Sequence, residues 1–233
     1  MGTIRAVIFD VDGTLVDTNP AHIEAWCRAF ERLGFQVPPE RIVPEVGKGG
    51  DKLVPSILGA ETEERLGEEL RQAQKEEFLE IARKQHFRIF PGAAEIFEAL
   101  RARGIRTALA TSSDEKHLSA TSASAGIDLK RLPDVVVSKS PDDASKPSPD
   151  LVVGAVEKLE LPASHCAMVG DTVYDGEACQ GAGVAFLGVL TGPATEQQLF
   201  DVGARAVWRD VGHLLIELDR AIEIAAVAAT AGG

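Results

Sequence analysis

Short apolar runs alternate with helical patterns along most of the chain, and this alternation constrains the fold most. Short, β-branched runs of this kind are typical of strands that are buried on both faces. Strands that alternate with helices predict an α/β fold: a doubly wound, Rossmann-like parallel sheet with helices on both faces. The expected strands cover residues 4–9, 105–110, 135–137, 167–169 and 184–189, and the expected helices cover residues 93–103, 115–125, 149–159 and 175–182.

One long segment, residues 18–88, breaks this alternation. Its apolar residues between positions 23 and 33 fall at helical spacing, and residues 61–85 are dense in Glu, Gln, Arg and Lys. We therefore expect a small all-helical cap domain at residues 18–88, inserted after the first strand. The α/β core domain would then comprise residues 1–17 and 89–233.

Charge and composition exclude several function classes. The formal net charge of −12 lacks the basic footprint of a nucleic-acid-binding protein, so no nucleic-acid partner is expected. No run of about 18 apolar residues is present, so no membrane partner is expected. Cys27, Cys166 and Cys179 are widely spaced and odd in number, which favours a reducing cytoplasm over a disulfide framework or a zinc site.

Two carboxylates, Asp10 and Asp12, follow the first predicted strand in the sequence FDVDGTLVD. Along an extended chain their side chains would point to opposite faces, so a turn at Asp12 and Gly13 would be needed to bring Asp12 back over the site. Taken alone, such a segment is often a plain turn or a fragment of a calcium loop.

Hydroxyl groups follow the strand predicted at residues 105–110, where Thr111 and Ser112 are found. Ser113 or Asp114 could simply cap the next helix. A hydroxyl and free amides at a helix N-terminus also form a phosphate-binding cradle, so both interpretations stay open.

Two later segments add a cation and further acids. Lys146 precedes a proline at a strand-to-helix junction, where the proline restrains its backbone. Asp171 and Asp175 follow the strand predicted at residues 167–169. Such an acidic pair suits Mg²⁺, although Asp175 could instead be a helix N-cap.

All four segments lie at predicted strand ends, where an open α/β sheet gathers its site. In this order and at these separations they resemble the four motifs of the haloacid dehalogenase-like superfamily, across essentially the whole chain. The inserted segment resembles a C1-type cap, and the sequence looks like the branch that contains phosphoglycolate phosphatase and β-phosphoglucomutase.

The resemblance implies a role for each residue. Asp10 would attack phosphorus, while Asp12 would protonate the leaving oxygen and later activate water. Thr111, helped by the amide of Ser112, would hold the transferring phosphoryl group, and Lys146 would neutralise its oxygens.

A magnesium cofactor is also implied by the resemblance. Asp171 would bind Mg²⁺ together with the carboxylate of Asp10 and the carbonyl oxygen of Asp12, and Asp175 would support the metal site. Gly13 would lie beside the substrate.

Two cap residues are further candidates for substrate binding. His22 matches a histidine near the general acid in the mutase branch, but a lone helical histidine is more often structural. Lys48 lies in the glycine-rich segment at residues 46–52, which resembles the specificity loop of C1 caps. It could contact a phosphate or carboxylate of the substrate, or belong to a solvated loop.

Taken together, these features predict a magnesium-dependent phosphatase that hydrolyses a small phosphate monoester through an aspartyl-phosphate. We expect a monomer or a small homo-oligomer. A phosphosugar mutase is the main alternative, although mutases of this branch typically carry Glu-Asp where this chain has Gly170-Asp171.

Three other activities fit the sequence less well. A metal-free dehalogenase usually lacks the acid at Asp12 and has no need of the pair Asp171 and Asp175. A phosphonate hydrolase would require a cap lysine that forms a Schiff base. A non-catalytic binding module is disfavoured because Asp10 and Lys146 are both present.

Overall fold

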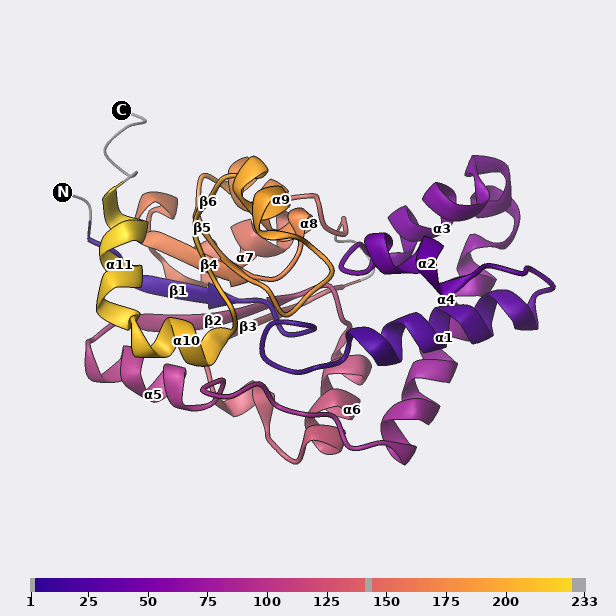
Figure 1. The fold of residues 1–233 in the computed structure, drawn as a ribbon, viewed down its shortest axis with the longest axis horizontal. Helices are drawn as coiled ribbons and strands as arrows, with labels where there is room; N and C mark the ends of the chain where they lie inside the picture. The colour runs from indigo at the N-terminus through magenta and orange to yellow at the C-terminus, as the bar shows by residue number, and fades with distance from the viewer. Residues whose placement is uncertain (1–2, 141–143, 228–233) are drawn as a thin grey trace.

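The computed structural model describes residues 3–140 and 144–227, and a six-stranded parallel sheet lies at its centre (Figure 1). The strand order is β3-β2-β1-β4-β5-β6, which confirms the predicted Rossmann-like sheet. The strands are β1 (Ala6–Phe9), β2 (Arg106–Thr111), β3 (Val135–Ser138), β4 (Cys166–Gly170), β5 (Ala185–Val189) and β6 (Ala204–Trp208).

The edge strand β6 was missed in the sequence. It pairs only with β5, and its three central residues are only partly buried. An edge strand does not need the continuous apolar run that marks a strand buried on both faces, and Arg205 interrupts this one.

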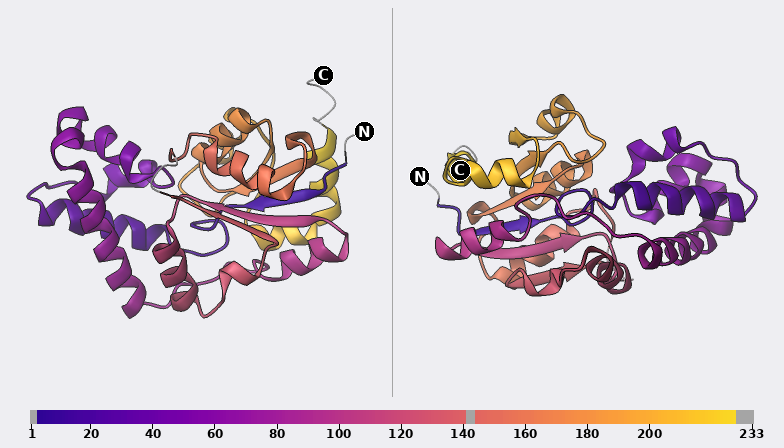
Figure 2. Two further views of the ribbon diagram at one scale, coloured as in Figure 1. Left: turned by 180° about the vertical axis from the view of Figure 1, so that it is seen from behind. Right: turned by 60° about the horizontal axis from the view of Figure 1, so that its bottom comes forward.

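Helices cover both faces of the sheet (Figure 2). Val7 and Phe9 of β1 face the apolar layer formed with α5, α6, α10 and α11, whereas Ala6 and Ile8 face the layer formed with α7, α8 and α9. The predicted helices agree with the structure to within two residues at each end. The helices and short 3₁₀ turns of the core are α5 (Glu95–Ala102), α6 (Glu115–Ala125), η2 (Leu129–Arg131), α7 (Asp150–Leu159), η3 (Ala163–His165), α8 (Val173–Ala182), α9 (Glu196–Asp201), α10 (Val211–Ile216) and α11 (Leu218–Val227).

A separate group of helices lies beyond the carboxyl ends of the strands (Figure 1). Its own apolar cluster includes Trp26, Phe30, Leu53 and Leu70. Phe78 of α4 instead joins the main core cluster, which fixes this group to the sheet domain. The members are α1 (Asn19–Arg32), α2 (Pro39–Ile42), η1 (Val43–Glu45), α3 (Gly50–Leu58) and α4 (Ala60–Lys84).

The two chain segments that enter and leave this helical group run side by side. Asp17 N donates to Arg88 O at 2.9 Å, and Phe90 N donates to Leu15 O at 3.0 Å. We propose that residues 18–88 form a cap domain joined to the core by this pair of segments. None of the helices in the described part of the chain is both long and apolar enough to cross a bilayer.

Candidate active site

The central strand β1 brings three of the four motifs together. Phe9 is in register with Leu109 of β2 on one side and with Val169 of β4 on the other. Parallel strands end at the same edge of the sheet, so the residues that follow them become neighbours. Asp10 continues this arrangement, because its amide donates to the carbonyl of Val169 at 3.0 Å.

Lys146 reaches this edge from the connection between β3 and α7. Its Nζ donates to Asp10 Oδ1 at 2.5 Å and to Asp175 Oδ1 at 2.7 Å, and all three residues are buried. Burial lowers the pKa of Lys146, but the two carboxylates outweigh burial and raise that pKa above its usual range. The ammonium is therefore a fixed positive charge beside Asp10.

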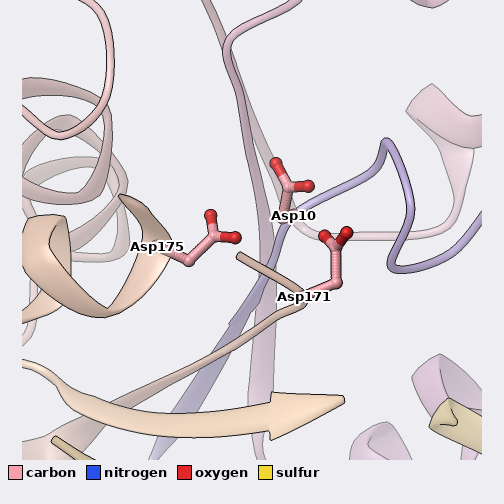
Figure 3. A group of neighbouring side chains, drawn as sticks. All are labelled: Asp10, Asp171 and Asp175. Atoms are coloured by element: carbon pink, nitrogen blue, oxygen red, sulfur yellow. The ribbon is translucent and has the colours of Figure 1, made fainter. Parts of the chain in front are cut away.

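Three buried carboxylates, those of Asp10, Asp171 and Asp175, face one shared space (Figure 3). One oxygen from each lies within 4.8 Å of the others. Burial raises the pKa of Asp10, and burial and the charge of Asp175 raise the pKa of Asp171 to about 7. One lysine does not compensate three acids, and oxygen-only donors suit hard divalent cations, so this triad fits a metal ion.

Asp175 has two structural roles. Its Oδ2 accepts from the backbone amide of Thr172 at 3.0 Å while Thr172 caps α8, which completes a capping box. Its Oδ1 holds Lys146. The interpretation of Asp175 as the N-cap is therefore wrong, because the N-cap is Thr172 and Asp175 lies three positions later.

The carboxylate of Asp171 accepts hydrogen bonds from two residues that were not predicted from the sequence to be site residues. Thr14 Oγ1 donates to Asp171 Oδ1 at 2.9 Å, and Asn19 Nδ2 donates to Asp171 Oδ2 at 3.1 Å. Gly13 lies against the same carboxylate with a φ of +79°, and a Cβ there would approach Asp171 Oδ2 to 2.2 Å. Thr14 belongs to the first motif, whereas Asn19 begins α1 and carries no sequence signal of its own.

The turn expected at Asp12 and Gly13 is present, and the Asp12 side chain lies over the strand ends. Its carboxylate accepts from Thr18 Oγ1 at 2.7 Å and from Ser113 Oγ at 2.8 Å. His22 Nε2 lies 3.3 Å from Asp12 Oδ1. Burial raises the pKa of Asp12, but the charge of His22 and these hydrogen bonds hold that pKa well below its usual range.

His22 itself is fixed from three sides. Its ring stacks on Phe78 with centroids 4.2 Å apart, and its Nδ1 lies 3.4 Å from Gln74 Nε2. The structure thus places His22 beside Asp12, with the packing of a structural histidine.

The residues that follow β2 have two roles: Thr111 and Ser112 lie at the site, and Asp114 caps α6. Thr111 Oγ1 is buried, accepts from Ser113 N at 3.0 Å and lies 3.4 Å from Asp12 Oδ2. Ser112 Oγ is buried without a hydrogen-bond partner among the described residues, and Ser112 lines the cavity described next. Asp114 caps α6 through the amides of Lys116 and His117.

A cavity of about 910 Å³ lies between the strand ends and the helical group, and Asp10, Asp12 and Lys146 line its core side. Lys48 lines its other side, in an ion pair with Glu45 and 5.0 Å from the ring centroid of Tyr174.

The glycine-rich loop approaches the core closely at two positions. A Cβ at Gly47 would lie 2.7 Å from Thr172 Cγ2, and a Cβ at Gly49 would lie 1.9 Å from Ser145 Oγ. Glycine is therefore required there, because the loop packs directly on the core.

Comparison with known proteins identifies the family. A sequence model of the haloacid dehalogenase-like hydrolases matches residues 4–183. The chain is 34% identical over 184 residues to a phosphoglycolate phosphatase from Nitrosospira multiformis, covering 77% of this chain and 80% of that protein. A hydrolase structure from Pseudomonas syringae aligns with a TM-score of 0.84 at 25% identity, covering 92% of this chain and 98% of that one.

A longer relative contains a similar region. The chain is 30% identical over 220 residues to the Arabidopsis thaliana protein SUPPRESSOR OF QUENCHING 1, chloroplastic, covering 92% of this chain but 20% of that protein. The predicted family resemblance is confirmed by these matches. Both the fold and the sequence comparisons show that this chain belongs to the haloacid dehalogenase-like hydrolase family.

Proposed function

We propose that the chain is a magnesium-dependent phosphatase that hydrolyses a small phosphate monoester through an aspartyl-phosphate on Asp10. The observation that carries this proposal is the arrangement around Asp10. The ammonium of Lys146 lies 2.5 Å from the carboxylate of Asp10, and the second acid, Asp12, follows two residues later. All three residues line one cavity. The phosphatase name of a relative that is 34% identical over 184 aligned residues supports the same reaction class.

In the first step, Asp10 attacks phosphorus and the ester oxygen leaves. Two anions must approach each other, so Lys146 would reduce their repulsion and stabilise the charge on the phosphoryl oxygens. The hydroxyl of Ser112, which has no hydrogen-bond partner in the described part of the chain, would provide a further donor to these oxygens. Thr111 would act mainly by positioning Ser113 and Asp12, which its hydroxyl contacts.

Asp12 would move the protons of both steps. It would donate one to the leaving oxygen, and its carboxylate would then take one from the water that hydrolyses the aspartyl-phosphate. Its low pKa favours the carboxylate, which takes the proton of the second step. The proton of the first step would enter with the substrate as its monoanion, and Asp12 would pass it to the leaving oxygen. His22, Thr18 and Ser113 would orient it, and His22 is thereby a positioning residue.

The acidic triad would hold the cation. Asp10 and Asp171 would be ligands, together with the carbonyl oxygen of Asp12, and Asp175 would keep Lys146 and α8 in place. A bound Mg²⁺ supplies positive charge that polarises the phosphoryl group and offsets the buried acids.

A phosphosugar mutase is disfavoured by Gly170. A Cβ at this position would lie 2.6 Å from Cβ and Cγ of Asp175, so the glutamate typical of the mutases has no room beside Asp175 as it is arranged here. Three further expectations stay predictions. They are that the protein is found in a reducing cytoplasm, that it is a monomer or a small homo-oligomer, and that its substrate is a small phosphorylated metabolite.

The test is release of inorganic phosphate from an aryl phosphate and from a panel of natural phosphate esters, with Mg²⁺ and with EDTA. We expect metal-dependent release, and in Asp10→Asn a loss of about 10⁴-fold or more, as for other catalytic nucleophiles. Full turnover in Asp10→Asn would exclude the covalent mechanism, and no release of phosphate from any ester would exclude the phosphatase.

A further inference from the structure

The cavity has two parts, which we name by their residues. The phosphoryl half is lined by Asp10, Asp12 and Lys146. The leaving-group half lies between the cap and the core, and under the proposed function it would hold the group that is esterified to the phosphate. Its partly buried charged lining residues are Lys48, Asp51, Arg71, Lys75, Asp114 and Lys139.

Two lysines of the leaving-group half are paired with acids across the boundary between cap and core. Lys139 of the core donates to Asp51 of α3 at 2.9 Å, and Ser145 Oγ donates to the same carboxylate oxygen. Lys75 of α4 forms an ion pair with Asp114 of the core.

The other two partly buried cations are paired within the cap. Arg71 contacts Glu63 at 2.5 Å and Glu68 at 3.1 Å, and Lys48 is paired with Glu45. The side chains of these four cations are only 18 to 28% exposed. Lys116 also lines this half, but it is an exposed residue of α6 and its charge is screened by solvent.

An anionic leaving group would have to compete with these pairs. Taking Lys139 away from Asp51 would leave that partly buried carboxylate without a cation, which is costly. Asp114 would lose Lys75 but keep the amides of Lys116 and His117, so the cost there is smaller. The incoming anion would also lie beside those carboxylates and be repelled by them. Hydroxyl groups meet no such penalty, because they can donate to the carboxylates and accept from the ammonium groups without breaking a pair.

We propose that the leaving-group half selects an uncharged, hydroxylated leaving group, so that the substrate class is polyol or sugar monophosphates. Esters that carry a second phosphate or a carboxylate would be poor substrates. This inference rests on the proposed phosphatase function and narrows its substrate. It also disfavours a phosphosugar mutase, which must accommodate a sugar bisphosphate when it hands the phosphoryl group back.

The experiment compares matched esters that differ by one anionic group: glycerol phosphate with phosphoglycerate, and a hexose monophosphate with its bisphosphate. We expect kcat/KM to favour the first member of each pair by at least about tenfold. A preference for the second member would overturn the inference while leaving the phosphatase intact. No turnover of any ester would instead overturn the phosphatase on which the inference rests.

The variant Asp51→Asn tests the cause of the selectivity. It removes the charge that occupies Lys139 and keeps the size of the side chain, so we expect the preference to shift by several-fold toward the anionic esters. Glu76→Gln is the matched control, because it removes one negative charge from an ion pair with Arg32 outside the cavity. Equal shifts in the two variants would overturn the inference. The ratio of kcat/KM values is measured within each protein preparation, so a partly unfolded variant does not distort it.

Discussion

The phosphoryl half and the leaving-group half of the cavity are both crowded with charged side chains, but they differ in how those charges are balanced. Around Asp10, three buried carboxylates share one ammonium. Across the cap side, each partly buried cation already has a carboxylate partner. The first arrangement leaves negative charge uncompensated, which a bound cation would offset, whereas the second is balanced without a ligand.

This difference separates chemistry from selectivity. A site with excess buried charge attracts a counter-charge and can stabilise a charged transition state. A site whose charges are already paired gains little from a charged ligand and rejects it by repulsion. We therefore attribute catalysis to the strand ends and substrate choice to the contact between cap and core.

The largest contrast is expected between two lysine variants. Lys146→Met removes the buried ammonium beside Asp10 and should lower kcat/KM for a phosphate monoester by about 10²–10³-fold or more. Lys139→Met removes a paired cation from the leaving-group half and should change the same parameter by less than about tenfold, as expected of a partly exposed ion pair. Circular dichroism would verify that both variants fold. Equal losses in the two variants would contradict the division of the cavity into two halves.

A smaller effect is expected on thermal stability. The pKa of Asp171 is raised to about 7 in the folded protein, so its contribution to metal-free stability is present below about pH 4, the unfolded pKa, and is lost as the pH rises through 7. Mg²⁺ requires the ionised carboxylates, so the stabilisation by Mg²⁺ should increase over the same range.

Melting curves with Mg²⁺ and with EDTA would measure this effect. At a Mg²⁺ concentration about a hundredfold above Kd we expect about 2.7 kcal/mol, or roughly 5–10 °C for a chain of this size, at pH 8 and little at pH 5. Asp171→Asn should abolish the difference, and Glu76→Gln should preserve it. A stabilisation that is independent of pH, or that survives in Asp171→Asn, would contradict the proposed cation site.

The residues of the phosphoryl half could be predicted from the sequence because they follow buried parallel strands. Buried parallel strands are marked by apolar runs, and their carboxyl ends meet at one edge, so Asp10, Lys146 and Asp171 could be brought together without coordinates. Asn19 could not be found in this way, because it reaches Asp171 from the first residue of a cap helix. The strand β6 was not predicted because an edge strand does not need a continuous apolar run.

The ion pairs of the leaving-group half could not be predicted from the sequence, for a different reason. Lys139 and Asp51 are 88 residues apart, and Lys75 and Asp114 are 39 residues apart. Such pairs form only when the cap packs on the core, and no local periodicity encodes that contact. Lys48 was a candidate because of its glycine-rich loop, and its role in substrate binding stays a prediction. Its pairing with Glu45 was not predicted.

The most direct test of the central claim is to trap the covalent intermediate. The Asp12→Ala variant, mixed with Mg²⁺ and an aryl phosphate, whose leaving group needs no proton from Asp12, and then quenched in acid, should contain one phosphoryl group by intact mass, and peptide mapping should place it on Asp10. The variant that also carries Asp10→Asn should contain none. A phosphoryl group on another residue, or turnover at the parental rate without Asp10, would contradict nucleophilic catalysis by Asp10.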